Sequence, residues 1–202
     1  MPAPREITEP RQLVVEGRDA EALFQALLGQ IGVTGVQVQN FGGIRELRGF
    51  LKALCNAPSF AQVTSLGIVR DAETDAKAAF QSVCGALNGA NLTVPTQPMA
   101  PTGHSPQVNV LILPDATTPG MLETICLQAV GDDPVIECIE QYFECVEQRT
   151  GSRPRNMPKA RVQAFLASRL RPGLLMGQAA HAGYWRLDSP AFDHVRRFVQ
   201  AL

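Results

Sequence analysis

The chain has 202 residues, of which 45% are hydrophobic and 18% charged, so a sizeable core is expected and a disordered chain is excluded. No segment approaches the roughly 20 apolar residues that span a bilayer, and the polar, proline-containing N-terminus is not a signal peptide, so we expect a cytoplasmic protein without membrane contact. The net charge of −1 conceals an acidic part, residues 1–148 with 8 Lys/Arg against 17 Asp/Glu, and a basic part, residues 149–202 with 10 against 2.

The first two thirds of the chain alternate between short apolar runs and segments with helical periodicity. Gln12–Glu16 predicts a buried strand, and Gly17 then leads into a helix over Ala20–Ile31. Such alternation is typical of a parallel sheet covered by helices on both faces. The elements that follow are a strand at Val36–Phe41, a helix at Ile44–Ala57, a strand at Ser65–Val69, a helix at Thr74–Leu87, a proline-rich loop at Asn91–Pro106 and a strand at Val108–Leu113.

Everything after about Pro119 has helical patterns. We therefore predict an α/β fold with a Rossmann-like parallel four-stranded sheet and a helical C-terminal extension. The loop Gly151–Pro158 is the predicted boundary between a core of residues 1–150 and a basic extension of residues 151–202 packed on that core. The predicted helices are Met121–Ala129, Val135–Arg149, Lys159–Arg169, Leu174–Ala182 and Pro190–Leu202.

Five cysteines are present without a Cys-x-x-Cys pair. They predict reduced, mostly buried thiols and exclude both a disulfide framework and a zinc ribbon. Cys138 and Cys145, seven residues apart on a predicted helix, are expected to pack.

Acidic residues follow the predicted strands where ligands bind in open parallel sheets, beyond the carboxyl ends. Glu16 closes the first strand, Asp71 and Glu73 close the third, and Asp115 follows the fourth. Carboxylates that converge repel one another unless a cation lies among them, and oxygen ligands suit Mg²⁺ or Mn²⁺. The alternative is that each acid caps the next helix, and we assign Asp75 and Glu123 to that role.

Two segments together resemble a known family. LVVEGRDAE (Leu13–Glu21) and LGIVRDAETD (Leu66–Asp75), with Gly42-Gly43 between them, are similar to the paired signature of the Toprim (topoisomerase–primase) fold family. The chain is most similar to small stand-alone Toprim-like proteins related to the nuclease domain of OLD-type proteins. Asp71-Ala72-Glu73 departs from the family's usual Asp-x-Asp, because Glu73 is one methylene longer.

The resemblance implies phosphodiester chemistry. It implies that Glu16 acts as a general acid or base and that Asp71 and Glu73 hold Mg²⁺ (or Mn²⁺), with Asp115 as a second-metal or outer-shell ligand. Lys159 is a candidate to reach a scissile phosphate, as nuclease lysines do, although exposed lysines are usually only solvated. Arg70 is expected on the opposite face of its strand from Asp71.

The sequence lacks the residues that several other kinds of site require. The scattered histidines do not predict a zinc site, neither Walker A nor GxGxxG is present, and no tyrosine lies in a context suited to strand passage. Arginines surrounding Lys159 suit phosphate groups, although they can equally pair with acidic residues of the chain itself.

We therefore predict a Mg-dependent enzyme that processes nucleic-acid phosphodiesters, most simply a nuclease acting on DNA or RNA. One alternative is a non-catalytic or conditionally active Toprim subunit that works with a separate ATPase partner, in phage or plasmid defence. A metal-dependent phosphatase or nucleotide hydrolase is a third hypothesis. A homodimer is also left open.

Overall fold

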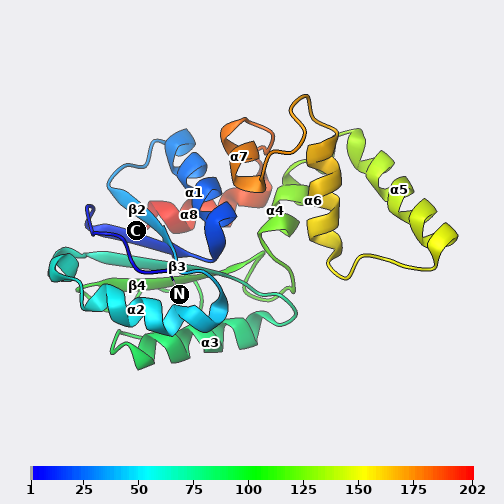
Figure 1. Ribbon diagram of the computed structural model, residues 1–202. Coiled ribbons are helices and arrows are strands. Elements are labelled where there is room, and N and C mark those ends of the chain that lie inside the picture. The colour runs from blue at the N-terminus through cyan, green and yellow to red at the C-terminus, as the bar shows by residue number, and fades with distance from the viewer. Residues whose placement is uncertain (1) are drawn as a thin grey trace.

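Four parallel strands form one sheet in the computed structural model, which describes residues 2–202 (Figure 1). Their order is β2-β1-β3-β4, so β1 and β3 are the two central strands. The predicted α/β class with its parallel four-stranded sheet is confirmed. The strands are β1 (Arg11–Val15), β2 (Val36–Asn40), β3 (Ser65–Asp71) and β4 (Gln107–Leu113).

Helices cover both faces of the sheet because the strands are apolar on both sides (Figure 1). On one face α2 (Leu47–Cys55) and α3 (Ala76–Gly89) bury a hydrophobic cluster that includes Phe41 and Phe50. The predicted helix at Ile44–Ala57 is divided, since a 3₁₀ turn (η1, Ile44–Glu46) precedes α2. A second 3₁₀ turn, η2 (Pro58–Gln62), leads into β3.

The opposite face carries α1 (Gly17–Ile31) and α4 (Leu122–Ala129), together with helices from the C-terminal quarter. These later helices contribute side chains to the same hydrophobic cluster as α1, so they are part of the packed fold. The split at residue 150 stays a prediction. The later elements are α6 (Met157–Ala167), α7 (Met176–His181), the 3₁₀ turn η3 (Pro190–Phe192) and α8 (Asp193–Gln200).

The helix α5 (Val135–Thr150) lies at the outer end of the molecule, beyond α6 (Figure 1). Only Ile139 and Phe143 are buried on it. The expectation that its cysteines pack is wrong, because Cys138 and Cys145 are both exposed. Of the five cysteines only Cys126 is fully buried, which also corrects the expectation of mostly buried thiols.

Within residues 2–202 no helix combines the length and apolar character needed to cross a membrane.

Candidate functional site

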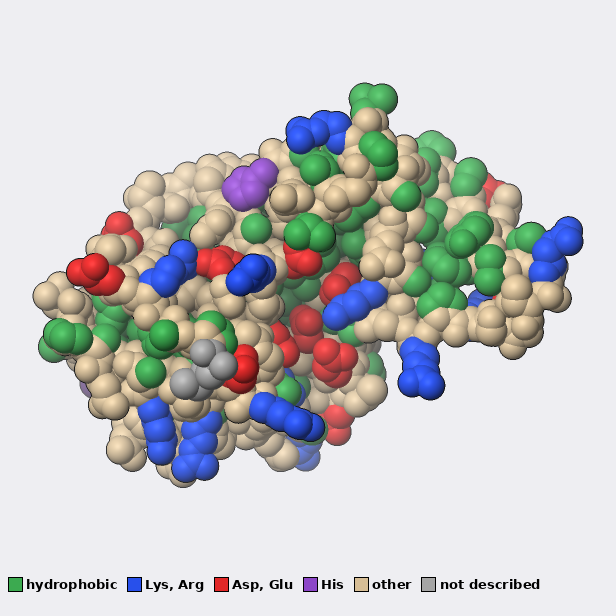
Figure 2. Space-filling view, in the orientation of Figure 1, with side chains coloured by type: hydrophobic (Ala, Val, Ile, Leu, Met, Phe, Trp, Pro, Cys, Tyr) green, Lys and Arg blue, Asp and Glu red, His purple; other side chains and the backbone are tan. Residues whose placement is uncertain are grey.

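Acidic residues at the ends of β1 and β3 lie at the carboxyl edge of the sheet. Glu16 directly follows β1, Asp71 is the last residue of β3, and Glu73 lies two residues further on. Their charges act on one another, since Glu16 and Glu73 both contribute to raising the pKa of Asp71. Acidic side chains gather near the middle of the face shown in Figure 2, with basic side chains beside them.

Asp71 is the most perturbed of these carboxyl groups. Burial raises its pKa to about 7, and the negative charges of Glu123 and Glu16 act in the same direction. The backbone N–H of Leu122, 3.0 Å from Oδ1 of Asp71, opposes the shift by donating a hydrogen bond. This hydrogen bond ties Asp71 to the first residue of α4, while its surroundings make it hold a proton more tightly than an ordinary aspartic acid.

Glu16 is positioned by a turn that needs glycine. Gly17 has φ +81°, so the chain leaves β1 sharply and Glu16 becomes the N-cap residue of α1. Burial raises the pKa of Glu16, while the nearby Arg70 guanidinium lowers it and the Glu73 carboxylate raises it. The backbone N–H of Ile44, at the start of η1, donates to the Glu16 carboxylate and also lowers the pKa.

Glu73 is held in a left-handed backbone conformation, with φ +55°. Its backbone N–H and carbonyl pair with the carbonyl and N–H of Gly120, both at 2.8 Å. A Cβ atom on Gly120 would lie 2.9 Å from both Pro114 Cδ and Thr124 Oγ1, so glycine is required there. This bridge joins the loop after β3 to the loop before α4 and brings the first turn of α4 to the site.

Glu123, in that first turn, is a member of the site that the sequence analysis missed. It is the charge with the greatest effect on Asp71, and burial raises its own pKa as well. The sequence interpretation as a helix-capping acid describes its position in α4, but not its proximity to Asp71. The available signal was that a helix after a parallel strand begins at the carboxyl edge of the sheet.

Lys159 lies beside this acidic group, from α6. Its Nζ is 4.0 Å from Oε1 of Glu123, and its charge lowers the pKa of both Glu16 and Glu123. The side chain of Asn156 accepts a hydrogen bond from the Lys159 backbone N–H and so caps α6 at this point.

Asp115 has a local role in the structure. Its carboxylate accepts hydrogen bonds from the backbone N–H groups and the hydroxyls of Thr117 and Thr118. Burial works against ionisation, but these hydrogen bonds outweigh it and hold the pKa of Asp115 well below its usual range. The structure thus commits Asp115 to its own loop, and a role as an outer-shell ligand stays a prediction. Asp75 caps α3 by accepting from the Ala78 N–H at 3.0 Å, as predicted.

Arg70 brings a positive charge to the acidic edge. Its Nη1 donates to the carbonyl of Ala79 in α3, on the side that strand alternation predicts, yet its charge still acts on Glu16 and Glu73. Its Nε is buried and has no hydrogen-bond partner among residues 2–202.

Two of the arginines near Lys159, which suit phosphate groups, form ion pairs with acidic residues of the chain itself. Arg161 pairs with Glu140 at 2.5 Å, and Arg153 pairs with Glu147 at 3.1 Å. For these two the alternative of pairing with the acidic face of α5 is what the structure shows. Arg155 is exposed and makes no ion pair within the described residues.

The donor set of Glu16, Asp71, Glu73 and Glu123 fits a hard divalent cation, because it consists of carboxylates alone and carries an excess of negative charge. In the described part of the chain, however, no three or more His, Cys, Asp or Glu side chains are placed so that they could hold a metal ion as they stand. Binding would therefore require side-chain rotation among these carboxylates.

The sheet, with acidic groups at its carboxyl edge, defines an α/β protein whose candidate site lies where such folds bind ligands. The chain belongs to the family described as protein of unknown function (DUF3226), whose sequence profile matches residues 10–202. No curated protein and no solved structure matches it.

Proposed function

We propose that this chain is a Mg²⁺- or Mn²⁺-dependent enzyme acting on nucleic-acid phosphodiesters, most simply a nuclease. The observation that carries the proposal is the gathering of Glu16, Asp71 and Glu123 beside Lys159 at the carboxyl edge of the sheet. The resemblance of the segments at Leu13–Glu21 and Leu66–Asp75 to the Toprim signature supports the same chemistry. The predicted cytoplasmic location is part of this proposal.

Each residue has a role that follows from its surroundings. Asp71, Glu73 and Glu123 would hold the cation, which when bound stabilises negative charge on the phosphate undergoing transfer. The pKa of Glu16 is raised by burial, which suits a group that accepts and returns a proton. Lys159, 4.0 Å from Glu123, offers positive charge to a substrate phosphate at the rim.

Metal binding is tested by thermal unfolding with and without Mn²⁺. A ligand that binds only the folded state raises the melting temperature, so Mn²⁺ should stabilise the wild-type chain. Asp71→Asn should abolish this stabilisation, because it removes the most buried carboxylate of the site. Glu144→Gln, which removes an exposed carboxylate on α5, is the matched control and should leave it intact.

Catalysis is tested on labelled DNA and RNA in the presence of Mn²⁺. Glu16→Gln should reduce cleavage by about 100-fold or more, as expected for loss of a general acid or base, while the Mn²⁺-induced rise in melting temperature persists. If Glu16→Gln loses metal binding together with cleavage, Glu16 is a ligand and its assignment as the proton carrier is wrong. Turnover of mononucleotides but not polymers would instead favour the phosphatase or nucleotide-hydrolase hypothesis.

A second candidate, a Toprim subunit that becomes active with a separate ATPase partner, is favoured by two observations. The carboxylates do not form a ready cation site in the described residues, and Arg153 and Arg161 are engaged with α5. Metal binding without turnover of any nucleic acid would support this function over the first.

A further inference from the structure

The helices α2 and α3 present a basic surface to solvent on one face of the sheet. Arg45, Arg48 and Lys52 follow one another at spacings of three and four residues, so they form a row along η1 and α2, here called the basic row. All three are exposed, and the buried residues of α2 lie on its opposite side. Neither α2 nor α3 contains an acidic residue, and α3 adds the exposed Lys77. Basic side chains gather over these two helices in Figure 2.

The charges of the basic row are available to a partner. Within residues 2–202 none of its three members forms an ion pair, unlike the arginines that are paired with α5. The acid between them in the sequence, Glu46, accepts a hydrogen bond from the backbone N–H of Gly43 at 3.1 Å. Unpaired positive charges on a surface of this kind attract polyanions.

The basic row begins at the acidic site. The backbone N–H of Ile44 donates a hydrogen bond to the Glu16 carboxylate, so η1 starts beside the first carboxylate of the site. Arg45 is the next residue of η1. Lys159 acts on the same carboxylate from α6, which belongs to the hydrophobic cluster on the other face of the sheet. Basic groups therefore flank the acidic edge from both faces.

The length of the basic row matches a strand of nucleic acid. The seven residues from Arg45 to Lys52 advance by about 10 Å along a helix. Successive phosphates of one strand in a duplex advance by about 3.4 Å along the axis. The three basic side chains can therefore meet about three successive phosphates.

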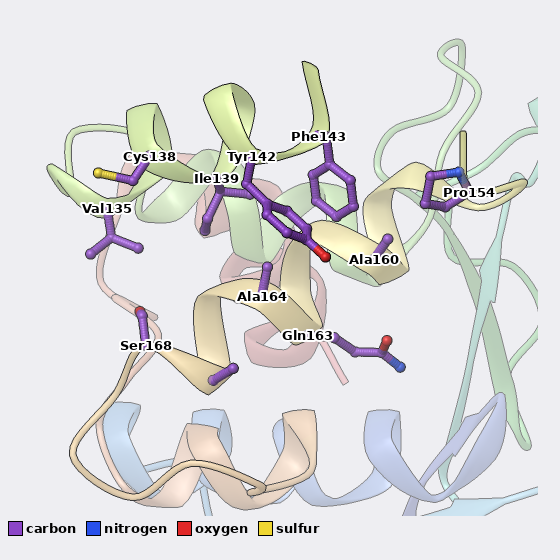
Figure 3. Close-up of a pocket in the computed structure, with 11 residues that line it drawn as sticks. Val135, Cys138, Ile139, Tyr142, Phe143, Pro154, Ala160, Gln163, Ala164 and Ser168 are labelled. Atoms are coloured by element: carbon purple, nitrogen blue, oxygen red, sulfur yellow. The ribbon is translucent and has the colours of Figure 1, made fainter. Parts of the chain in front are cut away.

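Other partners and other surfaces fit less well. A helix that binds a membrane surface carries an apolar stripe beside its basic one, but in the described part of the chain no exposed large hydrophobic side chain lies on α2 or α3. The groove of about 750 Å³ between α5 and α6 is lined by no charged residue, so it does not suit a polyanion (Figure 3).

We propose, on the basis of the proposed function, that the basic row binds the sugar–phosphate backbone of the nucleic acid whose phosphodiester reaches Glu16. Contacts of this kind are made to phosphates, so they position the strand without reading its sequence. Arg45 is the first contact beyond the reacting phosphate, and Lys159 lies on the other side of it.

The test is the binding of a short fluorescent DNA duplex, measured by anisotropy in EDTA at several salt concentrations. The triple variant Arg45→Ala, Arg48→Ala, Lys52→Ala should reduce the slope of log affinity against log salt by about 2.7, because each phosphate contact contributes about 0.9. Arg45→Ala alone should reduce the slope by about 0.9. Arg197→Ala is the matched control, because it removes an exposed and unpaired charge from α8, and it should leave the slope unchanged.

The outcomes separate this proposal from the proposed catalytic function. An unchanged salt slope in the triple variant overturns the basic row, even when the wild-type chain cleaves nucleic acid in Mn²⁺. A reduced slope in a chain that shows no cleavage supports the basic row and counts against the catalytic function instead. Binding of the wild-type chain to anionic phospholipid vesicles but to neither DNA nor RNA also overturns it. Thermal unfolding checks that the triple variant is folded, and Arg45→Ala gives the same test where it is not.

Discussion

Asp71 occupies a position that disfavours its ionised form in the folded chain. It is half-buried at the end of β3, and Glu123, Glu16 and Glu73 all add negative charge around it. A carboxylate in such surroundings binds a proton or a cation in order to be neutralised. Asp71 cannot move out of these surroundings because the backbone on either side of it is fixed. The strand β3 holds one side, and the Glu73–Gly120 bridge holds the other.

This position makes stability depend on pH. The pKa of Asp71 is about 7 in the folded chain against an ordinary 3.8, so the folded state holds its proton more tightly. The resulting stabilisation is fully present below pH 3.8 and is lost as the pH rises through 7. The difference between the two values corresponds to on the order of 4 kcal/mol.

Asp71→Asn should therefore stabilise the metal-free chain above pH 7, by up to about 4 kcal/mol, and flatten its pH dependence. Denaturant unfolding in EDTA at a series of pH values measures both effects. Asp75→Asn is the control, because asparagine is an equally good N-cap and the exposed end of α3 is outside the site. An unchanged pH profile in Asp71→Asn would show that Asp71 ionises freely.

At the scale of elements, α7 packs on α1 at very short range. The backbone N–H of Gly177 donates to Oδ1 of Asp19 at 3.1 Å, which ties the first turn of α7 to the first turn of α1. A Cβ atom on Gly177 would lie 2.5 Å from Ala22 Cβ and 2.8 Å from the Asp19 carbonyl oxygen. The contact therefore depends on glycine, since neither neighbouring atom belongs to a flexible side chain.

Gly177→Ala should destabilise the chain by about 1–3 kcal/mol, because the added methyl group pushes α7 away from α1. Gly85→Ala is the matched control: it lies in α3, and no atom lies within 4 Å of its added Cβ. That change should instead stabilise by about 0.5–1 kcal/mol, through the higher helix propensity of alanine. Equal effects of the two substitutions in denaturant unfolding would contradict the close approach.

At the scale of the whole molecule, several basic residues of the C-terminal quarter form ion pairs with acidic residues of the body. Arg161 and Arg153 pair with α5, while Arg169 pairs with Asp133 and stacks on Phe165. Exposed pairs of this kind stabilise by only about 0–1 kcal/mol each, so their main effect is to occupy the arginines. Among the arginines between Arg149 and Lys159, Arg155 is the one we expect to meet a nucleic acid.

Binding of a short DNA duplex should consequently depend on salt through Arg155. Arg155→Ala should reduce the slope of log affinity against log salt by about 0.9, the contribution of one phosphate contact. Arg161→Ala removes the same charge, but from a residue already paired with Glu140, and should leave the slope nearly unchanged. Fluorescence anisotropy titrations at several salt concentrations measure both slopes, and equal changes would show that the α5 pairs open on binding.

The sequence by itself determined the order of the strands and helices along the chain, because apolar periodicity is a local property that tertiary packing preserved. It also placed Glu16, Asp71 and Glu73 at one edge, since the carboxyl ends of parallel strands share that edge. The tertiary structure decided what depends on distant segments. Glu123 reaches Asp71 only because Gly120 pairs with Glu73.

The same distinction explains why the exposure of the cysteines and the ion-pair partners of the arginines did not follow from the sequence. Periodicity shows which face of α5 is apolar, but not whether another element covers it, so the exposure of Cys138 and Cys145 was not predictable. Charge pattern shows that Arg161 needs a partner, but α5 and α6 had to be placed side by side before Glu140 could be identified. Periodic patterns depend on residues that are close in the sequence, whereas burial of side chains and formation of ion pairs depend on segments far apart in the chain.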